Sequence, residues 1–313
     1  MKQICLFAAL VAAVFAIAPL FMGDFYLNLV SQMMIAAVFA LSFNLLVGYA
    51  GLTSLGHAAF LGLAAYLSAW LTTRAGLGHG AAAVLSILGT VIVAGLFGLI
   101  ALRASGLGFL MITLALSQVL WGLAYRWVSV TNGDNGMTRL TRPAPFGIAL
   151  NSAAAFYWFA LIVTLVSFLL IAIFVRSAFG ASLKGTRDQA RRMSALGFNV
   201  WLIRWIVFVY AGFWAGVAGL LYVYYNKYIH PSSLSITTSA EGILGVIAGG
   251  SGTLIGPIIG AALVTFLKNF VSSYLDRWNM LLGFVFLIIV LLMPDGIVPG
   301  IQWLHRRWRE ARK

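Results

Sequence analysis

The amino-acid sequence predicts an all-α protein that crosses a membrane about ten times. Of its 313 residues, 62% are hydrophobic and only 9% are charged, and the mean hydropathy is +0.99. A water-soluble globule needs more polar surface than this composition supplies. The apolar residues also fall in runs of about 20, the length at which a helix spans about 30 Å of hydrocarbon. We therefore expect a single membrane domain over residues 1–313.

Charge and cysteine content narrow the function classes. The formal net charge is +13, but the basic residues stand at the ends of apolar runs and in the tail, as topology signals do. Nucleic-acid binding is therefore not expected. The one cysteine, Cys5, excludes an internal disulfide and a cysteine-based metal site. We expect neither a metal nor another cofactor.

Six apolar runs precede the most polar part of the chain. They lie near residues 4–22, 27–47, 53–73, 80–102, 107–128 and 155–175. The first run contains Ala16-Ile17-Ala18, a pattern typical of signal cleavage sites, but we interpret it as a retained helix. With Lys2 in the cytoplasm, six crossings return the chain there at Arg176, and the polar stretch 129–154 lies outside. This order agrees with the positive-inside rule.

Three more runs, near residues 204–226, 253–275 and 279–298, lead to a basic tail over 300–313 that we also expect in the cytoplasm. Three crossings cannot connect two points on the same side. We assign the missing crossing to residues 239–250, SAEGILGVIAGG, a short and glycine-rich segment. It is predicted to be a broken or partly crossing helix of the kind that transporters hold at their centre.

A second interruption lies at residues 48–57, GYAGLTSLGH. Non-helical backbone at membrane depth is tolerated only where it is buried in protein or faces a water-filled cavity. The two interrupted segments are therefore predicted to line a translocation path. The candidate path residues are Gly51, Ser54, Gly56, His57, Glu241, Gly249 and Gly250.

Two of these residues also have structural interpretations. Intramembrane carboxylates are commonly functional, but Glu241 can instead cap the amino end of the broken helix, where the helix dipole favours an acid. His57 can be a packing histidine or a residue that lines the path. Glycines at four-residue spacing predict close helix packing; they are Gly252, Gly256 and Gly260, and Gly212 and Gly216.

Residues 176–204, here called the basic loop, hold six basic residues and one acid between apolar runs. The charge bias places the loop in the cytoplasm. Thr186 and Gln189 have the spacing of a capping box and Gly197 that of a stop, which predicts a helix over 186–196. Ala190, Met193 and Leu196 share one face, which suits a groove on a soluble partner. The alternative is a loop that contacts anionic headgroups.

Two strings resemble catalytic signatures but lack their context. Residues 180–186 have the opening spacing of a phosphate loop, but Arg187 follows Thr186 and no strand precedes the string. Residues 249–252 match the G-x-S-G of intramembrane serine proteases, but the sequence offers no nearby base. We therefore expect that this chain is not an enzyme and does not bind ATP.

A series of strings, in one order along nearly the whole chain, resembles the LivM branch of the LivM/LivH class of permease subunits of ABC importers for branched-chain amino acids. They are GYAGLTSLGHAAF (48–60), TLA (113–115), TNGDNG (131–136), RDQ (187–189), LGFN (196–199), AGVAG (215–219), GGSGTLIGP (249–257) and PDG (294–296). The sequence departs from the family pattern at Asn132, Ala190, Arg192 and Met193.

The resemblance implies a type II-like permease in a bacterial inner membrane, with both termini cytoplasmic. Its implied partners are ABC ATPase subunits, a second homologous permease subunit and a periplasmic binding protein. The basic loop becomes the coupling helix, with contact residues Thr186, Arg187, Asp188, Gln189, Ala190, Arg191, Met193 and Gly197.

The implied function is alternating-access transport of branched-chain or related small amino acids, driven by ATP hydrolysis in the partner. Backbone N–H groups near Thr53 to Gly56 are expected to meet the substrate carboxylate. The alternative is a secondary transporter or channel that works alone. It would need paired charges inside the spans, and beyond Glu241 the sequence shows none.

Overall fold

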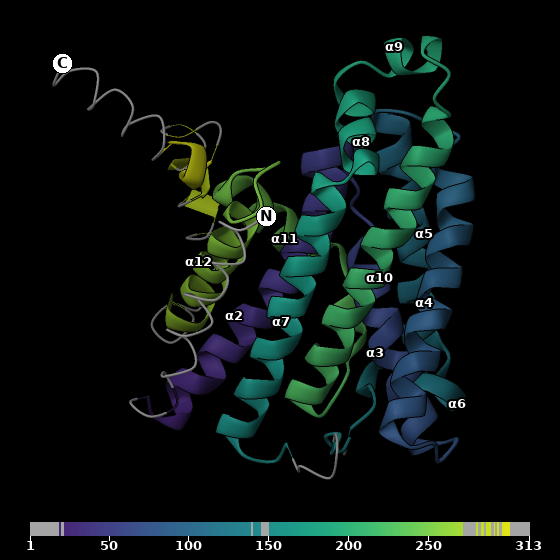
Figure 1. Cartoon of the computed structure of the whole chain (residues 1–313). Coiled ribbons are helices and arrows are strands. Elements are labelled where there is room, and N and C mark those ends of the chain that lie inside the picture. The colour runs from purple at the N-terminus through teal and green to yellow at the C-terminus, as the bar shows by residue number, and fades with distance from the viewer. Residues whose placement is uncertain are drawn as a thin grey trace, which may run out of the picture.

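The computed structural model is a helical bundle (Figure 1). It describes residues 22–138, 140–144 and 150–271, together with Pro19 and separate positions between 280 and 300. Most of the expected span at 4–22 and part of that at 279–298 lie outside the described residues. Figure 1 shows the basic loop at one end of the bundle, here called the α9 end, with the loop around α6 at the opposite end.

The long helices follow the apolar runs. Among the described residues, five are long and apolar enough to cross a membrane, and three further apolar helices are shorter. The five are α2 (Asp24–Asn44) with its π-helical extension η1 (Leu45–Ala50), α4 (His79–Ala101), α5 (Leu107–Arg126), α7 (Ala153–Arg176) and α10 (Val200–Asn226). The shorter ones are α3 (Ala58–Thr73), α11 (Ile236–Gly249) and α12 (Gly256–Val271). A multi-pass helical protein is thereby confirmed, whereas ten crossings remain a prediction.

Helix α10 forms the centre of the bundle and packs against α2, α3 and α4. Its buried face carries Val207, Phe208 and Ala211, followed by small residues that let neighbouring backbones approach. A Cβ added at Gly212 would lie 2.6 Å from Cβ of Ala94, and one at Gly219 would meet the carbonyl of Leu61. The predicted packing role of the Gly212 spacing is therefore confirmed.

The outer helices reverse the pattern of a soluble protein. On α4 the residues turned inward are small, with Ser86, Thr90 and Ala94 buried. Large apolar side chains face outward on the same helix, and they are Val84, Leu85, Leu88, Ile92, Leu96, Leu99 and Ile100. In water such a surface would drive aggregation, but it is compatible with lipid. The hydroxyls of Ser86 and Thr90 donate to carbonyls of their own helix, which satisfies them without water.

The interruption predicted at 48–57 begins later than expected, because η1 continues the helix to Ala50. The expected helix over 53–73 begins only at Ala58, because Gly51 adopts φ +68° and ends η1, and residues 51–57 then run without helix. A Cβ at Gly56 would meet the carbonyl of Thr113, so this stretch lies against α5. Helix α3 therefore starts inside the bundle.

The second short helix, α11, follows a turn that packs into the bundle. The 3-10 turn η4 (Pro231–Leu234) packs against α3 and α5, and Leu234 lies against Gly62. Ser235 then caps α11, whose 14 residues extend about 21 Å at 1.5 Å per residue, less than the about 30 Å of a hydrocarbon core. A short helix is thus present where the sequence predicted one at 239–250, with its start shifted to Ile236. Its partial crossing of the membrane stays a prediction. Two glycines in the second half of α11 pack on α12: Gly245 lies against Gly260, and Gly249 lies against Gly256.

The starts of the two short helices are in direct contact. The backbone N–H of Ala58, at the start of α3, donates to Ser239 Oγ in the first turns of α11 at 3.1 Å. Helix starts carry N–H groups without partners in their own helix. A side chain of α11 thus satisfies an N–H at the start of α3, and the two interruptions of the sequence form one structural unit.

Candidate functional site

The basic loop folds into two helices, α8 (Ala178–Asp188) and α9 (Ala190–Ala195), and the single helix predicted over 186–196 is wrong. Ser177 caps α8 by accepting from the N–H of Gly180 at 3.3 Å. Thr186 is therefore not a cap but lies buried in the last turn of α8. The chain turns at Gln189, which has an extended φ of −151°. The T-x-x-Q pattern thus spans a helix end and not a helix start.

The stop predicted at Gly197 is present. Gly197 adopts φ +87°, and the N–H of Phe198 donates to the carbonyl of Met193 at 3.1 Å, which closes a Schellman motif. Met193 turns inward, because its sulfur lies against Gly185 of α8. It therefore does not belong to an outer apolar face with Ala190 and Leu196, as the spacing predicted.

The exposed surface of this end is basic and apolar. Leu196 is 67% exposed and Phe198 is 44% exposed. Arg191 and Arg192 are exposed beside them on α9. Exposed apolar residues with a basic rim are typical of a protein interaction site.

Arg187 connects the basic loop to the two interruptions. Its Nη1 donates to the carbonyl of Gly48 in η1 at 2.6 Å, and its Nε pairs with Asp188 at 2.9 Å. The side chain also packs on Gly51, where an added Cβ would lie 2.9 Å from Arg187 Cγ. On its other side, a Cβ at Gly252 would lie 3.5 Å from Nη1. One side chain thus touches both glycine-rich segments.

The two segments also contact each other directly. Asn44 Nδ2 donates to the carbonyl of Thr253 at 2.7 Å, and its Oδ1 accepts from the N–H of Gly252 at 2.8 Å. A Cβ at Gly48 would meet both Asn44 Oδ1 and the N–H of Gly252, so only glycine fits there. We call Asn44, Gly48, Gly252, Thr253 and Arg187 the glycine junction. Asn44 was not among the predicted site residues, although an amide within an apolar run was a usable signal.

A cavity of about 640 Å³ lies between α2, α10, η4, α11 and α12. This volume is within the range of small-molecule sites, about 300–1,000 Å³. Its lining includes Tyr222, Tyr225 and Asn226, in the last turns of α10, and therefore lies toward the end opposite α9. Along α2, the lining residue Ala40 precedes Asn44 and Gly48. The glycine junction thus stands between the cavity and the basic loop.

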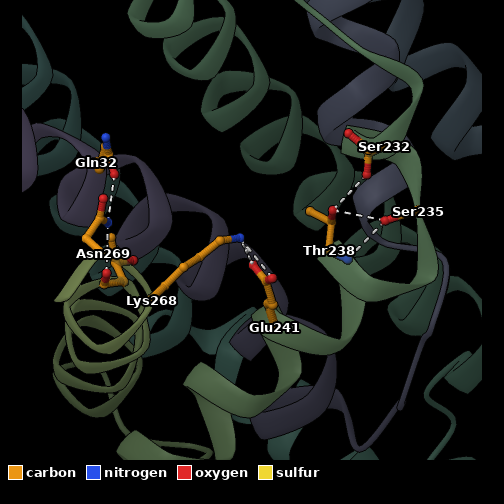
Figure 2. A network of polar contacts seen from close by, with 8 residues as sticks. Gln32, Ser232, Ser235, Thr238, Glu241, Lys268 and Asn269 are labelled. Atoms are coloured by element: carbon orange, nitrogen blue, oxygen red, sulfur yellow. Dashed lines mark hydrogen bonds and ion pairs between the residues drawn. The ribbon is translucent and has the colours of Figure 1, made fainter. Parts of the chain in front are cut away.

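An ion pair stands in this cavity (Figure 2). Lys268 Nζ of α12 donates to both carboxylate oxygens of Glu241 of α11, at 2.9 and 3.0 Å. The Glu241 side chain is 23% exposed and that of Lys268 is 45% exposed. The interpretation of Glu241 as a cap is wrong, because Ser235 caps α11 and Glu241 lies beyond its first turn. The sequence did not reveal Lys268 as the partner, because 27 residues separate the two positions.

Neutral polar groups surround the pair. Gln32 Nε2 of α2 donates to the hydroxyl of Tyr225 at 2.8 Å, and Asn269 Nδ2 donates to Gln32 Oε1 at 2.9 Å. Thr238 of α11 donates to the carbonyl of Ser232 at 3.0 Å (Figure 2). The cavity wall thus combines charged groups, amides and hydroxyls with apolar residues such as Ile35 and Val264.

The other predicted path residues lie outside the cavity lining. His57 is buried among Phe39, Phe43 and Phe60, and its Nε2 is 2.9 Å from Ser42 Oγ. This geometry is that of a packing histidine. Gly249 and Gly250 lie at the carboxyl end of α11, toward the glycine junction.

Of the backbone N–H groups expected to meet a carboxylate, that of Gly56 already has a partner, as does the nearby N–H of Ala58. Gly56 donates to Ser54 Oγ at 3.3 Å, and Ala58 donates to Ser239 Oγ at 3.1 Å. A path role for Gly51, Ser54 and Gly56 thus stays a prediction. Within the part of the chain that the structure describes, no cluster of three His, Cys, Asp or Glu side chains could hold a metal ion.

Arg142 and the segment after the TNGDNG turn hold the end of the bundle opposite α9, and the sequence predicted neither contact. Arg142 donates to the carbonyls of Tyr224 at 3.0 Å and Tyr225 at 3.2 Å, at the end of α10. Its guanidinium lies 4.7 Å from the centre of the Phe156 ring. Burial lowers the pKa of Arg142 from its ordinary value. Met137, directly after the TNGDNG turn, pairs with Ile229 through two 2.9 Å bonds, which fixes the segment leading into η4.

Comparisons with known proteins agree with this architecture. A family model described as "Branched-chain amino acid transport system / permease component" matches residues 25–291. The high-affinity branched-chain amino acid transport system permease proteins LivM of Salmonella typhimurium and Escherichia coli K12 are 23% and 24% identical, over 95% of this chain and 75% of theirs. The autoinducer 2 import system permease protein LsrC of Salmonella paratyphi B is 28% identical over 56% of this chain and 51% of its own. No solved structure matches.

Proposed function

Because this chain belongs to the LivM-class family of branched-chain amino acid transport permeases, we propose that it carries branched-chain or related small amino acids across the bacterial inner membrane as the permease subunit of an ABC importer. Its relatives are permease subunits, so the energy source is expected in a separate ATPase. The relatives named for autoinducer 2 import show that this sequence class also serves other solutes. The choice of amino acids is therefore part of the proposal.

The observation that supports the mechanism is the contact of Arg187 with the carbonyl of Gly48 at 2.6 Å. It joins the basic loop to the glycine junction, and the junction lies between the cavity and the α9 end. We propose that the ATPase docks on α8 and α9, with Arg191, Leu196 and Phe198 at the contact. Movement of α8 would then withdraw Arg187 and separate the two glycine segments.

Alternating access follows from this arrangement. In the described conformation the cavity lies toward the end opposite α9, and the glycine junction separates it from the basic loop. With the basic loop in the cytoplasm, this state would be closed to the inside. A periplasmic binding protein would deliver substrate at the opposite end, and a second permease subunit would complete the membrane part.

The coupling role is tested by replacing Arg187 and Arg191 with glutamate. Loss of the bond from a charged donor, about 1.5–3 kcal/mol, corresponds to at least a tenfold effect. We expect ATP-driven leucine uptake by the reconstituted complex to fall by about that factor or more, while membrane insertion is unchanged. Arg103→Glu, a change of an exposed arginine outside the basic loop, is the matched control. Unchanged uptake in the double variant contradicts the coupling role.

One observation favours the alternative of a transporter that works alone. The Glu241–Lys268 pair is the kind of paired charge inside helices that such a transporter needs. ATP dependence separates the two functions. Uptake that requires a co-purifying ATPase supports the importer, and robust uptake by the purified chain without ATP supports the alternative.

A further inference from the structure

We propose that Glu241 and Lys268 form a subsite for the two charges of a zwitterionic solute, which enters between them during transit. The inference rests on the proposed function and specifies its substrate class. It starts from the only ion pair that the described residues place in the cavity, in which both side chains remain partly exposed.

The pair is positioned to separate. Glu241 extends from α11 and Lys268 from α12, so the two charges belong to different helices. Lysine has a flexible stem and a compact charge, which allows it to move without rebuilding its helix. Neighbouring amides and hydroxyls from Gln32, Asn269 and Tyr225 can accept or donate as the charges part.

Charge balance selects the solute. An α-amino acid brings an ammonium group and a carboxylate close together, so its ammonium can pair with Glu241 while its carboxylate pairs with Lys268. One ion pair is then replaced by two, and no charge is left without an opposite partner. A monoanion would pair with Lys268 and leave Glu241 alone. A neutral amide would have to break the pair without replacing either charge.

The remaining wall suits an aliphatic side chain. Ile35, Ala36 and Val264 line the same cavity. Small-molecule sites combine such apolar surface with a few convergent polar groups. The site therefore fits leucine better than a polar or strongly charged amino acid.

Protection of an introduced thiol tests the subsite by binding and not by transport. Thr237 lines the cavity one turn before Glu241, on the same face of α11. The full complex carrying Cys5→Ser and Thr237→Cys is treated with a water-soluble thiol reagent in native membranes. The concentration that halves the labelling rate should be at least tenfold lower for leucine than for two analogues. These are 4-methylpentanoate, which lacks the ammonium group, and 4-methylpentanamide, which lacks both charges. Ser129→Cys, at an exposed position outside the cavity, should show no protection.

Charge-removing variants complete the test. Glu241→Gln should abolish the preference for leucine over 4-methylpentanoate, because the remaining Lys268 pairs with either carboxylate. Lys268→Gln should abolish the preference for leucine over 3-methylbutylamine, because the remaining Glu241 pairs with either ammonium. Lys227→Gln, a change of an exposed lysine outside the cavity, should leave both preferences unchanged. The exchange Glu241→Lys with Lys268→Glu restores a pair and should recover part of both preferences. This recovery also shows that loss in the single variants is not misfolding.

The outcomes separate the subsite from the proposed function. ATP-driven leucine uptake by the unmodified complex, combined with equal protection by leucine and the amide, overturns the subsite and leaves the importer intact. Leucine-selective protection without any ATP-driven uptake supports the subsite and contradicts the importer. A preference that survives both single substitutions also overturns the subsite.

Discussion

At the scale of single residues, Asn44 and Arg187 give the glycine junction its polar contacts. Asn44 is buried and uses both ends of its amide, toward Thr253 and Gly252. Arg187 adds a charged donor from outside the bundle. A buried polar group that loses its hydrogen-bond partner lowers the free energy of unfolding, because no water replaces the bond. This holds for the amide and for the backbone groups that it contacts.

The first prediction concerns Asn44. Asn44→Leu keeps the side-chain size but leaves the N–H of Gly252 and the carbonyl of Thr253 without this partner. We expect the free energy of unfolding to fall by about 1–3 kcal/mol, measured as an earlier thermal transition in detergent. Ser31→Ala is the control, because Ser31 is equally buried but bonds only to Leu27 of its own helix. An equal shift in both variants would argue against a special role for the junction.

The sequence predicted some residues well and others poorly, for physical reasons. Gly197 and Gly51 were identifiable, because positive φ is a local requirement that favours glycine. Lys268 was not, since its pairing with Glu241 depends on how two helices pack. Met193 was misplaced because a period of three or four residues does not tell which side of a helix faces its neighbour.

At the scale of elements, the short helices α3 and α11 were predictable as interruptions but not as a unit. Glycine clusters marked both breaks. Only the fold brings their starts together and lays Gly245 and Gly249 of α11 against Gly256 and Gly260 of α12. The helix boundaries moved by three to five residues where a cap such as Ser235 or a turn such as Gly51 competed with apolar periodicity.

The second prediction concerns this helix pair. Gly260→Ala would place a Cβ against the carbonyl of Gly245 and 2.7 Å from the N of Gly249. Because both are backbone atoms, α11 and α12 must separate, and we expect lower thermal stability and weaker uptake. Gly122→Ala on α5 is the matched control. Nothing lies within 4 Å of its added Cβ, so its helix should gain up to about 1 kcal/mol. Similar effects of both changes would contradict close packing of α11 on α12.

At the scale of the whole molecule, the bundle has two different ends. One carries the exposed basic surface of α8 and α9, and the other is fixed by Arg142 and by the Met137–Ile229 pairing. The cavity lies toward the second end and the glycine junction toward the first. This polarity suits a permease that takes up solute at one end and contacts an ATPase at the other.

The third prediction fixes the orientation of this polarity. In the Cys5→Ser background, Ala190→Cys should react with an impermeant thiol reagent only in inside-out vesicles. Ser129→Cys should react only in right-side-out vesicles, because positive charge collects on the cytoplasmic side. The two positions serve as controls for each other. Labelling of residue 190 from the outer face would leave an ATPase without access to α9.

The bond between Ala58 and Ser239 has a consequence for measuring opening of the path. The amide proton of Ala58 sits at an interior helix start and is held by a hydroxyl of another helix. It exchanges with deuterium only when α3 and α11 part and water reaches them. This single proton is therefore a native sensor of hydration in the bundle, readable without any label.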